Sequence, residues 1–235
     1  MLERLERGGL FIQPLDNLRR WYSYHPLFAV FLQGELRTLQ PQRLNQLHLR
    51  AAEALLAENL PEEAARHAVQ AGDPLQVAEI LQRHGRAFYR QGQLGLLQQS
   101  LETLPETVIA GSPLLTLLQA WVSQNSYQFD HVERWFKAAE LALQRSCSEQ
   151  DWARIVCEFN AVRAQVAMNQ GDEQRAIALA QEALTCEPLI MRTSRVAAMS
   201  GLAEVHFVQG ALPQAQKQYE EAERRAREIN ASHLV

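Results

Sequence analysis

Some side chains in this sequence could support catalysis or metal binding by type. The candidates are Glu62-Glu63, Glu220-Glu221, His48, His67 and His84. The paired acids fall in runs with helical periodicity, where carboxylates usually face solvent instead of acting as general acid and base. The histidines fall on separate expected helices and lack the spacing of metal ligands. No G-x-S-x-G, H-E-x-x-H or G-x-x-x-x-G-K-[ST] motif occurs. The sequence therefore predicts neither an enzyme nor a metal site.

A second set of residues could bind a ligand without changing it. Its members recur near the ends of three expected helices and combine aromatic rings, planar amides and one carboxylate. Rings cover the apolar C–H faces of a neutral polyol such as a sugar, and amides pair with its hydroxyls. The alternative is that the rings pack between helices and the amides face solvent. The set comprises Trp121, Gln124, Asn125, Gln165, Asn169, Glu204 and Phe207.

The most aromatic stretch is RRWYSYHPLFAVFL, Arg19 to Leu32. Alternating residues of a two-stranded hairpin must bury one face, so its rings are expected to cover a small core and a seam between domains. This role is favoured over stacking on a nucleic-acid base. The residues expected to pack in this way are Trp21, Tyr22, Tyr24, His25 and Phe28.

Composition limits the class of protein. The 235 residues are 47% hydrophobic and 21% charged, as in a folded chain, and no apolar run approaches the roughly 18 residues of a membrane span. We expect a soluble, cytoplasmic protein without a membrane partner. The first 50 residues hold seven Arg against four acids, but these arginines are dispersed, so no direct nucleic-acid binding is expected. Cys147, Cys157 and Cys186 lack a paired motif and are expected to fill the core without a disulfide.

Elements of both kinds are expected before residue 40. In order, we expect a helix at 1–7, a strand at 10–12, a turn at 16–17, a strand at 21–24 and a helix at 27–39. The two strands would form a hairpin. The last helix places a broad apolar face on one side, formed by Leu27, Phe28, Phe31, Leu32 and Leu36.

Every element expected after Pro41 is a helix. We expect helices at 42–58, 61–71, 74–91, 93–103, 113–125, 129–145, 149–170, 173–186, 190–209 and 212–229, with Gly or Pro in most of the connections. Three alanine pairs share one spacing: Ala120 and Ala139, Ala164 and Ala183, Ala203 and Ala222. Alanines at facing positions let paired helices approach closely, which predicts three irregular tetratricopeptide-like repeats. Ala180 departs from the pattern, because an aromatic is expected there, and Pro188 would end the second repeat.

Two stretches together identify a family. The segment from Leu2 to Leu36, with its YHPLF box, and the run LHLRAAEALLAENLPEEAARHAVQAGD from Leu47 to Asp73 resemble the middle of the large ATP-dependent LuxR-type transcriptional activators. The resemblance continues more loosely through LLQAW and FNAVRAQVAMNQGD and covers nearly the whole chain. These proteins are signal-transduction ATPases that combine a nucleotide-binding region, a winged-helix domain, a helical sensor superhelix and a helix-turn-helix.

The resemblance implies an organisation and a function. It implies an all-α, tetratricopeptide-like superhelix preceded by a small β-hairpin, the remnant of a winged-helix domain. The expected divisions are 1–40 for that remnant, 41–111 for linking helical hairpins and 112–235 for the repeats. Such a piece of a longer regulator would sense an inducer, for example a sugar such as a maltooligosaccharide, and control self-association and contact with its own ATPase domain. ATP is expected only at the nucleotide-binding domain. The alternative is a protein-interaction scaffold without a small-molecule ligand.

Overall fold

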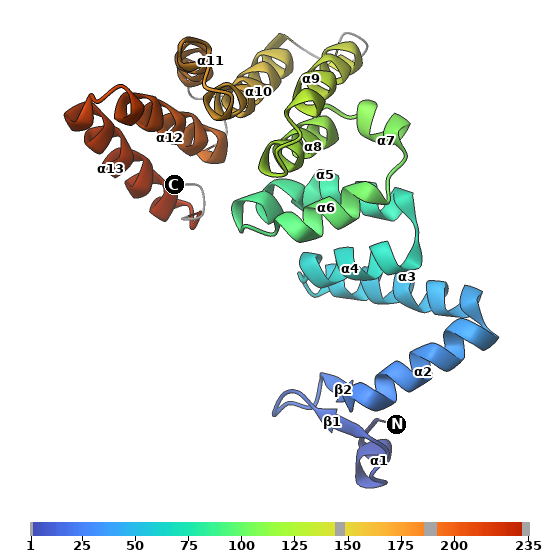
Figure 1. Cartoon of the computed structure of the whole chain (residues 1–235). Coiled ribbons are helices and arrows are strands. Elements are labelled where there is room, and N and C mark those ends of the chain that lie inside the picture. Colours follow the sequence, from blue (N-terminus) through green and yellow to red (C-terminus); the bar gives the residue numbers. More distant parts are fainter. Residues whose placement is uncertain (1, 144–148, 186–191, 232–235) are drawn as a thin grey trace.

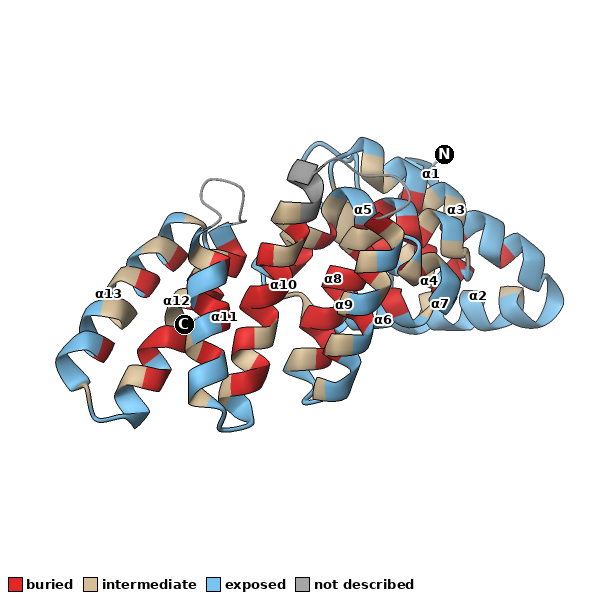
Figure 2. Ribbon diagram, turned by 90° about the horizontal axis from the view of Figure 1, so that it is seen from above, coloured by how far each residue is buried: buried red, intermediate tan, exposed pale blue. Residues whose placement is uncertain are grey.

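The structure, a computed structural model, describes residues 2–143, 149–185 and 192–231. Within them the chain forms thirteen helices and one two-stranded antiparallel hairpin, so the all-α prediction is confirmed. Helices α3 to α13 stack along an arc, while α2 leads away from the stack to the N-terminal hairpin (Figure 1). Buried residues concentrate where stacked helices face each other (Figure 2).

The hairpin differs from the prediction in its first strand. After α1 (Leu2–Arg7), β1 covers Ile12–Pro14 and pairs with β2 (Tyr22–Tyr24), so that Ile12 lies opposite Tyr24. The expected strand at 10–12 was wrong by two residues, because Phe11 adopts a left-handed φ of 54° that interrupts an extended strand. The expected turn is present. Asp16 Oδ1 accepts hydrogen bonds from the backbone N–H groups of Arg20 and Trp21, at 2.8 and 3.1 Å.

Helix α2 (Pro26–Leu39) has no buried residue. Pro26 begins it, which suits the first turn, where a missing N–H leaves no bond unmade. Its expected apolar face is only half covered: Leu27 and Phe31 are 77% and 59% exposed. Phe28 is partly buried and packs on Phe11, with ring centroids 5.1 Å apart. This helix therefore presents an apolar surface that the other described residues leave partly uncovered.

Five helices follow in the first part of the stack. They are α3 (Pro41–Ala57), α4 (Pro61–Ala71), α5 (Pro74–Arg90), α6 (Leu94–Glu102) and α7 (Glu106–Ala110). Gly72 ends α4 in a left-handed conformation, and Asp73 caps α5 by accepting from the N–H groups of Leu75 and Gln76. The short α7 was not expected. Helix α5 passes close to the next hairpin, because a Cβ on Gly85 would lie 2.4 Å from Leu118 Cδ1.

Three antiparallel pairs form the rest of the stack. They are α8 (Pro113–Asn125) with α9 (Phe129–Leu143), α10 (Glu149–Asn169) with α11 (Glu173–Thr185), and α12 (Arg192–Val208) with α13 (Leu212–Glu228). The six alanines of the predicted repeats are each at most 1% exposed. Burial of all six is consistent with the prediction that small residues let each pair approach closely. Pro188 lies outside the described residues.

The expectation about cysteines was wrong for Cys157. It is buried in α10 as expected, but it is disulfide-bonded. Cys147 and Cys186 lie outside the described residues.

Candidate functional site

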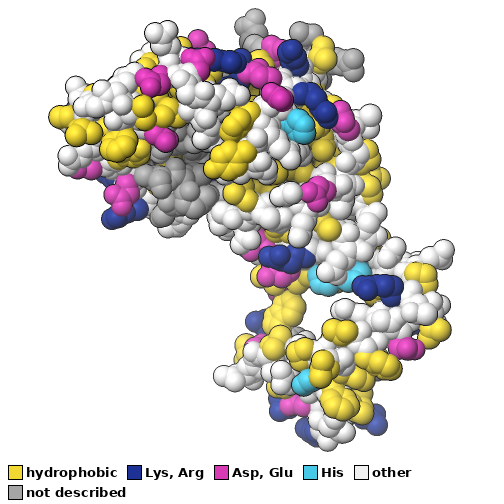
Figure 3. All heavy atoms as spheres, viewed as in Figure 1, with side chains coloured by type: hydrophobic (Ala, Val, Ile, Leu, Met, Phe, Trp, Pro, Cys, Tyr) yellow, Lys and Arg dark blue, Asp and Glu magenta, His cyan; other side chains and the backbone are white. Residues whose placement is uncertain are grey.

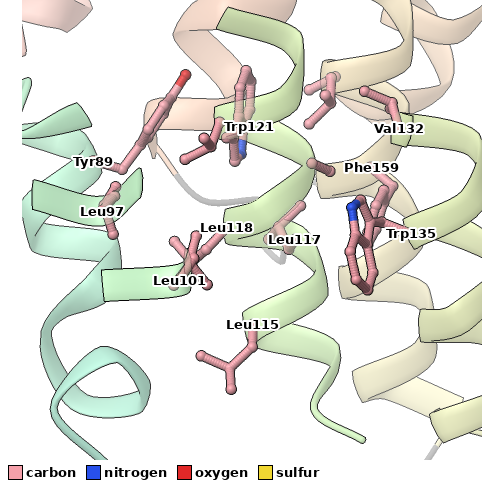
Figure 4. Close-up of a cluster of buried hydrophobic side chains, with 14 of the residues drawn as sticks. Tyr89, Leu97, Leu101, Leu115, Leu117, Leu118, Trp121, Val132, Trp135 and Phe159 are labelled. Carbon is pink, nitrogen blue, oxygen red and sulfur yellow. The ribbon is translucent and has the colours of Figure 1, made fainter. Parts of the chain in front are cut away.

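Trp121, the central member of the predicted ligand-binding set, is almost fully buried. Its side chain is 2% exposed and its ring stacks on that of Tyr89, with centroids 4.7 Å apart (Figure 4). Asn125 Nδ2 donates to the Trp121 carbonyl oxygen at 2.9 Å, and burial raises the pKa of the Tyr89 phenol. The Trp121 ring thus packs between α5 and α8, as the alternative interpretation had it for this residue.

The other six members lie toward the C-terminal ends of three helices. Gln124 and Asn125 are on α8, Gln165 and Asn169 on α10, and Glu204 and Phe207 on α12. Four of them are exposed, including Phe207 at 60%, and the two glutamines are partly buried. None of the six lines any of the three cavities described below. Their role in binding stays a prediction.

The acidic pairs do not assemble into a site. Glu62 and Glu63 are at the start of α4, and Glu220 and Glu221 are on α13. Hydrogen bonds from Arg224 and then Arg225 hold the pKa of Glu221 at about 2. This carboxylate is permanently ionised near neutral pH, which suits a surface ion pair and not proton transfer.

The first cavity joins the N-terminal hairpin to the stack. It has a volume of about 570 Å³ and is lined by Arg20, Trp21, Ala51, Ala54, Leu55, Ala57, Glu58 and His67. Trp21 is 41% exposed and lies at the seam where domain packing was predicted. Tyr22, Tyr24 and Phe28 lie elsewhere on the hairpin and α2, where Tyr24 packs edge-on against Phe28 at 5.6 Å. His25 is exposed and precedes α2.

Two of the candidate histidines meet beside this cavity. His48 on α3 and His67 on α4 place their Nδ1 atoms 2.8 Å apart. Burial lowers the pKa of both rings, which favours the neutral imidazole in each. His84, on α5, instead stacks on Phe88. In the part of the chain that the structure describes, no three His, Cys, Asp or Glu side chains gather as a metal site would require.

A buried carboxylate joins α5 to α10, and sequence reasoning missed it. Glu158 is 1% exposed, and its Oε1 lies 3.1 Å from Arg86 Nη1 and 3.2 Å from Arg154 Nε. Burial raises the pKa of Glu158, and the two guanidinium groups oppose that effect. Both arginines line a second cavity of about 430 Å³ beside the start of α8. The only signal for this cluster in the sequence was a charged residue at a position of a helix that faces a neighbouring helix.

The third cavity spans the arc. It measures about 470 Å³ and is lined by Arg90 and Gln91 at the end of α5, Arg192 and Thr193 at the start of α12, and Glu228, Ile229 and Asn230 at the end of α13. Its two sides are far apart in sequence and meet because the stack curves. A change in that curvature would alter the cavity.

Comparisons with known proteins agree over the whole chain. Residues 1–44 match the family model of the MalT winged helix domain. The chain is 38% identical over 235 residues to the HTH-type transcriptional regulator MalT of Yersinia pestis (strain Pestoides F), and 38% identical over 234 residues to that of Yersinia enterocolitica serotype O:8. It covers 26% of the length of each relative. No helix among the described residues is long and apolar enough to cross a membrane. The chain is therefore similar to MalT along its whole length and spans about a quarter of the length of the curated relatives that it matches.

Proposed function

We propose that this chain is the part of a cytoplasmic MalT-like transcriptional regulator that senses a small-molecule inducer and controls self-association. It catalyses no reaction itself in this proposal, and ATP binds to a different part of the regulator. The inducer is a neutral sugar such as a maltooligosaccharide. Similarity to transcriptional regulators over all 235 residues supports the regulatory role.

The observation that carries the sensing role is the curved stack. Its curvature brings Arg90 within one cavity of Arg192 and Glu228, although these residues belong to different helical pairs. A ligand that binds one curvature better than another shifts the population toward that curvature. The change would reach the ATPase domain through the winged-helix segment at the other end.

A thermal-shift panel on the whole chain tests this proposal. Linear maltooligosaccharides, other neutral sugars and ATP are compared at equal concentration. A sugar present at about 100 times its dissociation constant stabilises the folded state by about 2.7 kcal/mol. We expect a selective rise in melting temperature with one sugar and none with ATP. A flat response to every sugar would refute the sensing role.

The second candidate is a protein-interaction scaffold. The exposed apolar face of α2, with Leu27 and Phe31, favours it, because such patches often mark contacts with other proteins. Light scattering with and without the Phe31→Asp change would test this candidate. Sugar-independent self-association that the change abolishes would support it.

A further inference from the structure

The cavity between the N-terminal hairpin and the α3–α4 pair has the composition of a small-molecule site. Ligand sites are mostly apolar, measure about 300 to 1,000 Å³ and occur preferentially where domains meet. This cavity measures about 570 Å³ and lies between the segment that matches the winged-helix model and the helices that follow it. Figure 3 shows the molecule hollowed between these two parts.

Two walls of the cavity are largely apolar. Ala51, Ala54 and Leu55 are spaced along one face of α3, and the two alanines keep that face shallow. The hairpin contributes Trp21, whose side chain is 41% exposed although it lies in the same cavity lining as residues of α3 and α4. An indole and a row of methyl groups both bury apolar ring faces well.

The polar groups of the lining nearly cancel in charge and have few partners within the described part of the chain. They are the Arg20 guanidinium, the Glu58 carboxylate and the His67 imidazole. Among the described residues, neither Arg20 nor Glu58 has a side-chain hydrogen bond or ion pair, and His67 uses only Nδ1, in its contact with His48. One positive and one negative group beside a neutral imidazole favour an uncharged ligand with both donors and acceptors at its edge.

We infer that this cavity binds a small uncharged ring compound whose faces are apolar and whose edge carries hydroxyl or N–H groups, chemistry that a pyranose and a nucleoside base share. This deepens the proposed function, on which it rests, by placing the sensed ligand against Trp21 and neither in the row that includes Trp121 nor in the third cavity, whose shape would follow the change in curvature. A ligand held there touches both the hairpin and α3–α4. Binding therefore sets the angle between the winged-helix segment and the superhelix.

Fluorine NMR on the whole chain labelled with 5-fluorotryptophan tests the site directly. The chain has four tryptophans, and single Trp→Phe variants assign their signals. The probes are glucose, maltotriose and adenosine, each titrated separately. We expect one class of probe to shift the Trp21 signal saturably and leave the Trp121 signal in place. No saturable shift at Trp21 with any probe would overturn the inference.

A matched pair of variants completes the test. Ala54→Leu fills the space beside Trp21 without removing a polar group, so the dissociation constant should rise by about tenfold or more. Gln46→Leu is exposed on the same helix outside the cavity and should leave the constant unchanged. Equal effects of the two variants would overturn the site.

The outcomes separate this inference from the proposed function. A sugar that stabilises the chain in the thermal-shift panel without shifting the Trp21 signal would leave the sensing role standing and refute this site. A Trp21 shift with adenosine alone would support the site and count against sugar sensing. Silence in both measurements would refute both.

Discussion

The Nδ1 atoms of His48 and His67 lie 2.8 Å apart in the seam between α3 and α4. At this distance the Nδ1–H of one ring donates to the Nδ1 of the other, so at least one imidazole must be neutral, and burial favours the neutral form of both. Protonation of both rings would place two donors and two positive charges against each other. Arg37 adds further positive potential at His48.

Stability should therefore fall in mild acid. Burial lowers the folded-state pKa of both histidines, so the unfolded chain binds more protons once the pH drops below the ordinary value of about 6.5. The free energy of unfolding is expected to decrease as the pH falls from about 7.5 through the ordinary histidine value, as urea titrations at several pH values would measure. His67→Gln should flatten this dependence, and the exposed His131→Gln should not. Identical pH profiles for wild type and His67→Gln would contradict the argument.

Removing the Glu158 carboxylate should destabilise the stack. In Glu158→Ala the partly buried Arg86 loses its counter-charge, and the expected loss is about 3 kcal/mol. Chemical denaturation measures the change. Glu79→Ala breaks an exposed pair with Arg83 and is the control, with an expected change within about 0.5 kcal/mol. Similar losses in the two variants would show that burial does not govern the effect.

The close approach of α5 and α8 can be tested at Gly85. Alanine favours a helix over glycine by about 1 kcal/mol, but its Cβ would lie 2.4 Å from Leu118 Cδ1. We expect Gly85→Ala to destabilise by about 1 kcal/mol in net terms, because overpacking costs about 1 to 3 kcal/mol. In a Leu118→Val background the same change should stabilise. A double-mutant cycle measures this, and an unchanged sign in both backgrounds would contradict the close contact.

The two aromatic members of the predicted ligand set should respond differently to truncation. Trp121→Ala removes a buried ring from its stack on Tyr89 and is expected to cost about 3 to 5 kcal/mol. Phe207→Ala, at an exposed position, should change stability by less than about 0.5 kcal/mol. Thermal unfolding distinguishes the two. Because of this cost, a loss of ligand binding in Trp121→Ala could follow from destabilisation alone. Phe207 is therefore the better position at which to test the predicted ligand-binding set.

Local chemistry made the helices predictable. Pro26, Gly72 and Asp73 mark helix ends through backbone effects that act over a few residues, and the structure places ends there. The five-residue α7 was not predicted, because so short a segment shows no hydrophobic periodicity. The first strand was misplaced because a left-handed φ at Phe11 is unusual for a bulky residue and follows from its surroundings, not from its type.

The candidate sites were less predictable because they depend on contacts between distant residues. An aromatic residue such as Trp121 suits a groove and a core equally by type, and only the position of Tyr89 decides between them. Arg86 and Glu158 each look like solvated helix residues in sequence. Trp21 lines a cavity together with alanines of α3, and those alanines gave no signal in the sequence, since alanine is common in the helices of this chain.

The buried ion pair between Arg86 and Glu158 also bears on how the chain reaches its native arrangement. Alanine-lined helical pairs resemble one another so closely that apolar burial alone distinguishes poorly between correct and shifted neighbours. A chain that stacked α10 against the wrong partner would bury the Glu158 carboxylate without Arg86, leaving only Arg154 of the same helix to offset its desolvation cost. The contact between Arg86 and Glu158 thus disfavours folding intermediates in which similar helical pairs are stacked on the wrong neighbours.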